Sequence, residues 1–205
     1  MSLKTLKYPL ESDNLFETLA IGTILIIASI FIIPWFIIMG FYMKVIHHSS
    51  KGKEIPKFEN YVDLTINGLK YAAVSLIYIV ALVAFVMFAS IIGDIHAALG
   101  VISFLLILVA YSLYVYLFPA IMYEFAQEYR ISDAFNFNKI LGYAKSVEYL
   151  KIALLLSLAY PILFTLLQFG VAITIIGLLF IPATIIYEMM VYGHLVSKVG
   201  EMENN

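Results

Sequence analysis

The sequence contains no cysteine, and it has few charged residues for its length. The absence of cysteine excludes disulfide bonds and thiolate metal ligands. Charged residues make up 13% of the 205 residues and hydrophobic residues 63%, whereas a soluble domain is typically about 25% charged and about 45–50% apolar. Because a core of this size cannot hide so much apolar surface, we predict an integral membrane protein whose main partner is the lipid bilayer.

Five long apolar segments predict an all-α, polytopic membrane protein that forms a single domain over residues 1–205. A membrane-spanning helix needs roughly 20 apolar residues, and several of these segments exceed that length. The predicted helices comprise residues 17–43, 64–92, 97–125, 150–169 and 172–196. The polar N-terminus lacks a small-residue cleavage site after a short apolar core, so we expect no signal peptide.

Lysine and arginine are absent from the two shortest connections, residues 93–96 and 168–172, and abundant in residues 44–63 and 127–151. If these five helices span the membrane in turn, only Lys4 and Lys7 lie on the opposite side of the membrane from the other basic residues. The positive-inside rule then predicts a plasma-membrane protein with its N-terminus outside and its C-terminus in the cytoplasm. The alternative is that residues 17–43 form a re-entrant hairpin bent at Pro34, which brings the N-terminus inside.

Residues 131–147 do not span the membrane but carry an apolar stripe, which predicts an amphipathic helix at the cytoplasmic interface. Ser132 and Asp133 are expected to cap its start. A shorter equivalent is predicted at residues 57–63. The stripe consists of Ala134, Phe135, Phe137, Ile140, Leu141, Ala144 and Val147.

A short sequence motif that contains proline and ends in glutamate occurs twice, as FPAIMYE at residues 118–124 and FIPATIIYE at residues 180–188. We predict an internal helix–loop–helix repeat, in which a proline-bearing helix is followed by a basic connection and a returning helix. The apolar segments are expected to kink at their prolines, because neighbouring helices can satisfy the freed carbonyls. These prolines are Pro34, Pro119, Pro161 and Pro182.

Glu188 and Glu124 are the candidate functional residues, because an ionisable group inside the membrane is costly and often has a function. The structural alternative is that each carboxyl is held by a neighbouring tyrosine in the helix bundle. His194 lies two turns beyond Glu188 and is a candidate for a proton relay with it. Beyond these, the sequence offers no nucleophile–base set, paired metal ligands or phosphate cradle, so we expect no metal, cofactor or nucleic acid.

The region from Gly40 to Gly68 resembles the signature of an uncharacterised, largely archaeal family of multi-pass membrane proteins, domain of unknown function 4013. The resemblance extends to Pro119, Phe135 and Phe137, and it implies a helical membrane fold without any established activity. The residues that carry the signature are Gly40, Lys44, Gly52, Pro56, Phe58 and Gly68.

We therefore expect a non-enzymatic membrane protein that acts as an accessory or scaffold subunit, associating with itself or with another membrane protein. The alternative is a small oligomeric transporter or channel in which Glu188 couples to protons or cations. An intramembrane enzyme that acts on lipid is the third hypothesis.

Overall fold

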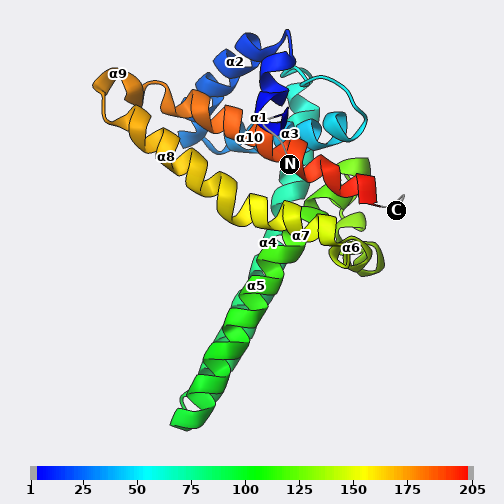
Figure 1. Cartoon of the computed structure of the whole chain (residues 1–205), viewed down its shortest axis with the longest axis vertical. Helices are drawn as coiled ribbons and strands as arrows, with labels where there is room; N and C mark the ends of the chain where they lie inside the picture. Colours follow the sequence, from blue (N-terminus) through cyan, green and yellow to red (C-terminus); the bar gives the residue numbers. More distant parts are fainter. Residues whose placement is uncertain (1–3, 203–205) are drawn as a thin grey trace.

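The computed structural model describes residues 4–202, which form helices and connections with no strand in that range, as the predicted all-α class requires. Figure 1 shows a long antiparallel hairpin, α4 (Tyr61–Gly93) and α5 (Ala97–Glu128), projecting from a body that holds both ends of the described chain. The body contains α1 (Lys4–Lys7), α2 (Leu15–Ile27), α3 (Ile32–Ser50), α6 (Phe137–Ala144), α7 (Val147–Leu154), α8 (Tyr160–Ala172), α9 (Ile175–Leu178) and α10 (Ile181–Ser197).

The most apolar stretch of each helix in the α4–α5 hairpin is almost entirely exposed and packs against little of the protein. Only 6% of the most apolar window of either helix is buried, so hydrocarbon is the solvent that suits its surface. At a rise of 1.5 Å per residue each helix is about 50 Å long, which exceeds the roughly 30 Å of a bilayer core. Small residues near the tip, including Gly93, Gly100 and Ser103, let the two helices approach closely.

Helices α3 and α4 cross in backbone contact at Gly40 and Gly68. A Cβ atom on Gly40 would overlap the carbonyl group of Leu64, and one on Gly68 would overlap that of Phe36. Only glycine allows two helices to approach this closely. This crossing anchors the long hairpin to the body.

The predicted single helix over residues 17–43 is wrong, because the chain breaks between α2 and α3. A short 3₁₀ turn covers Ala28–Ile30, and Phe31 is extended before α3 begins. Pro34 lies in the first turn of α3, where its ring would clash with the carbonyl of residue 30 if the helix were continuous. The break therefore precedes Pro34, and this proline starts a helix instead of kinking one.

Both ends of this broken segment lie at the same end of the molecule. The Tyr8 hydroxyl donates to the Lys53 carbonyl at 3.2 Å, and Lys57 forms an ion pair with Glu17 at 3.1 Å. The segment before α2 therefore lies beside the connection that follows α3, and the bend between α2 and α3 precedes Pro34.

The predicted helix over residues 172–196 is also interrupted. Helix α8 ends at Ala172, the short α9 follows, and α10 begins at Ile181 with Pro182 in its first turn. By length and composition, three helices are candidate membrane spans: Tyr61–Gly93, Ala98–Glu128 and Val147–Ala172. A fourth is counted if the bent pair Thr5–Glu11 and Leu15–Ile30 forms one span, so the structure supports three or four candidate spans rather than five.

The predicted interfacial helix over residues 131–147 is divided into a 3₁₀ turn at Asp133–Phe135, α6 and the start of α7. Asn136 caps α6 and Ser146 caps α7, because their side chains accept backbone N–H groups. The predicted cap at Ser132 makes no such bond. The stripe also divides, since Ile140 is fully buried whereas Phe137 and Leu141 are exposed.

The shorter interfacial segment predicted at residues 57–63 is not a separate helix. The chain is irregular up to Asn60, which adopts a left-handed conformation, and α4 begins at Tyr61. The side chain of Phe58 is buried in the body, so this segment packs inward.

The three segments that follow Pro34, Pro119 and Pro182 converge in the body. Helix α3, the second half of α5 and α10 contact one another and share one hydrophobic cluster. Their C-terminal ends are joined by polar contacts, including the Ser197 hydroxyl donating to Ser49 at 3.0 Å. This convergence positions the candidate site.

Candidate functional site

A buried tyrosine bonds to the backbone of α5 beside Pro119. The Tyr149 hydroxyl donates to the Tyr116 carbonyl at 2.5 Å and accepts the Ala120 N–H at 3.3 Å. Pro119 has no N–H, so the helical carbonyl that loses its partner is that of Val115, whereas the two groups that Tyr149 contacts lie on either side of the proline. Pro119 lies inside a helix that continues past it, and Tyr149 from α7 bonds to the backbone next to this proline.

A π-helical turn, Leu155–Ala159, separates α7 from α8 directly before Pro161. Proline has no N–H to offer the carbonyl four residues earlier, and its ring needs space there. The wider π turn supplies that space, and the Ser157 hydroxyl donates to the Ala153 carbonyl at 2.6 Å. Turns of this kind occur often at functional sites.

Residues of α3, α5, α10 and the segment from α7 to the π-helical turn line a partly open cavity of about 560 Å³. Pro119 lies in its α5 wall and Ser157 in its π-helical wall. The lining is mainly apolar and aromatic, and Glu188 is the one charged residue in it. A cavity of this size, with a small number of polar groups in an apolar wall, is typical of small-molecule sites.

Glu188 projects from α10 into this cavity and is half-buried. The Gln168 side-chain amide of α8 donates to one of its carboxylate oxygens at 2.9 Å. Gln168 was placed in an outer connection by the sequence analysis, but α8 continues to Ala172 and brings it against α10. Glu188 can thus offer a carboxylate oxygen to a proton or a cation in this mainly apolar cavity.

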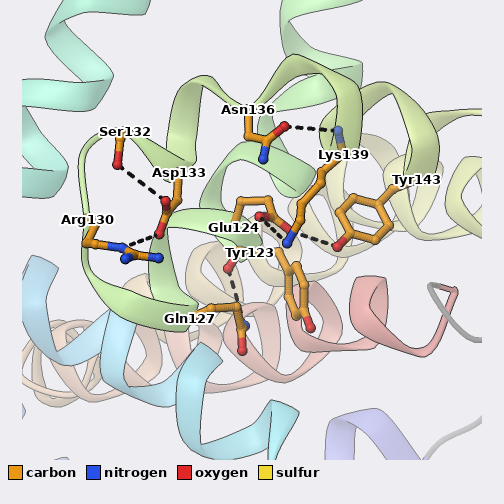
Figure 2. Close-up of polar contacts among 9 residues, drawn as sticks. All are labelled: Tyr123, Glu124, Gln127, Arg130, Ser132, Asp133, Asn136, Lys139 and Tyr143. Atoms are coloured by element: carbon orange, nitrogen blue, oxygen red, sulfur yellow. Dashed lines mark hydrogen bonds and ion pairs between the residues drawn. The ribbon is translucent and has the colours of Figure 1, made fainter.

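Glu124 has a different environment, shown in Figure 2. It is buried with only 5% of its surface exposed, and the Tyr143 hydroxyl donates to it at 2.6 Å. The ammonium group of Lys139 lies 3.7 Å from its other oxygen. Both partners come from α6 (Figure 2), so Glu124 fastens α6 to α5.

A separate polar pocket of about 410 Å³ adjoins Glu124 at the end of α5. Its charges are largely paired, since Arg130 contacts Asp133 at 3.0 Å and Lys139 contacts Glu124. Asn136 uses its side-chain oxygen to accept the Lys139 backbone N–H. The geometry therefore favours the structural interpretation of Glu124.

His194 contacts residues other than Glu188. Its ring stacks on Tyr8 with centroids 4.1 Å apart, and its Nδ1 atom lies 2.5 Å from the Ser49 hydroxyl. No hydrogen bond between His194 and Glu188 occurs within residues 4–202, so the structure does not bring together the predicted relay. His194 instead ties the N-terminal segment and α3 to the end of α10.

His47 is held as a neutral imidazole by two partners of opposite type. The Ala126 carbonyl, 3.0 Å from Nδ1, can only accept, whereas the Lys51 ammonium, 2.9 Å from Nε2, can only donate. Nδ1 therefore carries the single proton. Burial, and then the charge of Lys51, lowers the pKa of His47 below its ordinary value.

Acidification from about pH 7.5 to about pH 5.5, across the ordinary histidine pKa of about 6.5, is expected to destabilise the fold. The lowered pKa means that the unfolded chain binds this proton more readily, so the stabilisation is complete above the ordinary pKa and declines as the pH falls. Thermal unfolding in detergent at both pH values measures this. His47→Gln should reduce the pH dependence.

The family-signature residues shape the connection between α3 and α4. Besides Gly40 and Gly68 at the crossing, the Lys44 ammonium donates to the Lys57 carbonyl at 3.1 Å. Gly52 has φ +65, a left-handed conformation that ends α3. Pro56 is buried, and the Phe58 ring stacks on Phe41 with centroids 3.8 Å apart.

The sequence analysis missed Tyr149 and Gln168 as site residues. Nothing near Tyr149 in the sequence points to Pro119, which is 30 residues away. Gln168 is a polar residue at the end of an otherwise apolar run, and this feature of the sequence could have marked it as a candidate site residue.

Comparison with known proteins adds a family but no activity. The model of the family described as protein of unknown function (DUF4013) matches residues 23–169, more than half of the chain. No curated protein and no solved structure matches it significantly. Within residues 4–202, no group of three or more histidine, aspartate or glutamate side chains could hold a metal ion.

Proposed function

We propose, from the premise that this chain belongs to the DUF4013 family of proteins of unknown function, that it is a non-enzymatic membrane transport protein. In this proposal Glu188 binds a proton or a cation in the intramembrane cavity. The observation that carries it is the placement of this one carboxylate in the wall of a mainly apolar cavity of about 560 Å³. An intramembrane carboxylate that faces a cavity is a typical element of ion and proton pathways.

We also propose that both termini are cytoplasmic. The contact between Tyr8 and Lys53 supports this, as does the contact between His194 and Ser49 at the other end of the chain. With this topology, all 12 lysine and arginine residues lie at one face of the membrane or within about three helical turns of it. The positive-inside rule assigns that face to the cytoplasm of the plasma membrane.

Glu188→Gln is expected to lower proton or cation flux in proteoliposomes by at least about tenfold, which corresponds to about 1.4 kcal/mol. The amide keeps the shape of the side chain but cannot bind a proton or carry a negative charge. Flux is measured with a pH-sensitive dye and with a radioactive monovalent cation. Glu59→Gln, in the exposed connection before α4, is the matched control and should retain full flux.

The second candidate is an accessory or scaffold subunit that associates with itself or another membrane protein. The α4–α5 hairpin favours it, because its outer part contacts nothing else in the described chain and exposes large apolar side chains along both helices. If Glu188→Gln leaves flux unchanged and the wild-type protein purifies with one stoichiometric partner, the scaffold function replaces transport. The three segments that follow Pro34, Pro119 and Pro182 pack around one hydrophobic core, and this supports the proposed internal repeat.

A further inference from the structure

We propose that the Glu188 cavity binds a lipophilic organic cation, a molecule with an apolar body and a delocalised or quaternary positive charge. This rests on the proposed function in assigning Glu188 to cation binding, and it specifies the substrate class. The cavity combines the three features that such a ligand requires: an apolar wall, aromatic faces and one carboxylate.

The aromatic side chains of the lining come from three different helices. Tyr42 lies on α3, Tyr114 and Phe118 lie on α5, and Tyr192 lies on α10 beside Glu188. The faces of aromatic rings attract cations, and the attraction increases where water is excluded. Four rings around a single carboxylate suit a large cation whose charge is spread over its surface.

The same lining is unsuited to a bare divalent ion. Divalent cations such as calcium take six to eight oxygen ligands, whereas this cavity offers one carboxylate and isolated hydroxyl groups from tyrosine and Ser157. A small hydrated cation would gain little from the apolar side chains that form most of the wall. A cation with its own apolar body makes use of both parts of the lining.

The position of the cavity in the fold suits a ligand that dissolves in the bilayer. The cavity is lined from α5 and from the π-helical turn before α8, and these helices diverge from this region in Figure 1. Apolar side chains beyond the cavity are exposed on both, including Tyr111 and Leu113 on α5 and Ile162 on α8. A lipophilic cation partitioned into hydrocarbon can approach along this surface.

A matched pair of ions tests the inference. Tetraphenylphosphonium and tetraphenylborate have the same shape and opposite charge. Equilibrium dialysis of each against the purified full chain in detergent should show at least tenfold tighter binding of the cation. Glu188→Gln should remove this preference by weakening phosphonium binding at least tenfold without weakening borate binding.

A second variant keeps the test decisive if Glu188→Gln does not fold. Tyr42→Leu removes an aromatic face without touching the charge, and it should weaken phosphonium binding roughly three- to thirty-fold. Tyr61→Leu, at an exposed position at the start of α4, should bind as the wild type does. Equal binding of the two ions by the wild type, which would indicate a neutral amphiphile, or unchanged phosphonium binding by the folded variants overturns the inference.

The two proposals can fail separately. If phosphonium binding depends on Glu188 but no flux is found, the cavity is a binding site and the transport function is wrong. If flux depends on Glu188 but phosphonium does not bind, transport stands and the lipophilic-cation assignment is wrong.

Discussion

Gly68→Ala is expected to prevent the body from assembling on the α4–α5 hairpin. The added methyl group would overlap the Phe36 carbonyl, which belongs to the backbone of α3 and cannot move aside as a flexible side chain can. Overpacking a rigid site costs about 3 kcal/mol or more, a large part of a typical stability of about 5–15 kcal/mol. Size-exclusion chromatography in detergent and the thermal unfolding midpoint measure the loss.

Two further glycines test whether the effect belongs to the crossing. Gly40→Ala should be equally damaging, because its methyl group would overlap the Leu64 carbonyl from the other side of the same contact. Gly170→Ala in α8 should be harmless, since nothing lies within 4 Å of the added atom. A well-folded Gly68→Ala protein would show that α3 and α4 are not held at this distance.

The fold class and the α4 and α5 helices could be predicted from the sequence, because long apolar runs leave few alternatives in a bilayer. The broken segments could not be predicted in the same way. Pro34 and Pro182 start helices whereas Pro119 lies inside one, although all three occur in similar apolar runs. Tyr149 bonds to the α5 backbone beside Pro119, and no local pattern in the sequence predicts such a long-range contact.

The spacing between proline and glutamate in the sequence differs between the two glutamates, and so do their environments in the structure. Glu124 is five residues after Pro119, and Glu188 is six residues after Pro182. One residue corresponds to about 100° around a helix. The two similar motifs therefore place their carboxylates on different faces of their helices relative to the proline. Glu124 consequently meets α6, whereas Glu188 meets the cavity.

The residues of the family signature illustrate a further limit. Gly40 and Gly68 were identified through a resemblance, which marks positions without giving their role. Only the geometry shows that the two glycines face each other across a helix crossing and that Lys44 supports the same connection. The signature therefore reports how α3 and α4 are joined, while the cavity is built mainly from other residues.

Tyr149→Phe is expected to destabilise the protein by about 1–3 kcal/mol. It removes the hydrogen bonds of the Tyr149 hydroxyl to the Tyr116 carbonyl and the Ala120 N–H, and one such bond contributes about 0.5–1.5 kcal/mol. Chemical denaturation in mixed micelles measures the change. Tyr111→Phe, at an exposed position on α5, is the control and should be neutral.

A double-mutant cycle with Pro119→Ala tests the cause of this loss. Alanine supplies an N–H that can bond to the Val115 carbonyl, so the turn that holds Tyr116 and Ala120 can become more regular and depend less on the Tyr149 hydroxyl. Tyr149→Phe should then cost at least about 0.5 kcal/mol less than it does in the wild type. An equal cost in both backgrounds would mean that the role of Tyr149 does not depend on Pro119. Because Pro119 lines the cavity, replacing it should also weaken phosphonium binding, which links the helix around one buried tyrosine to the shape of the candidate site.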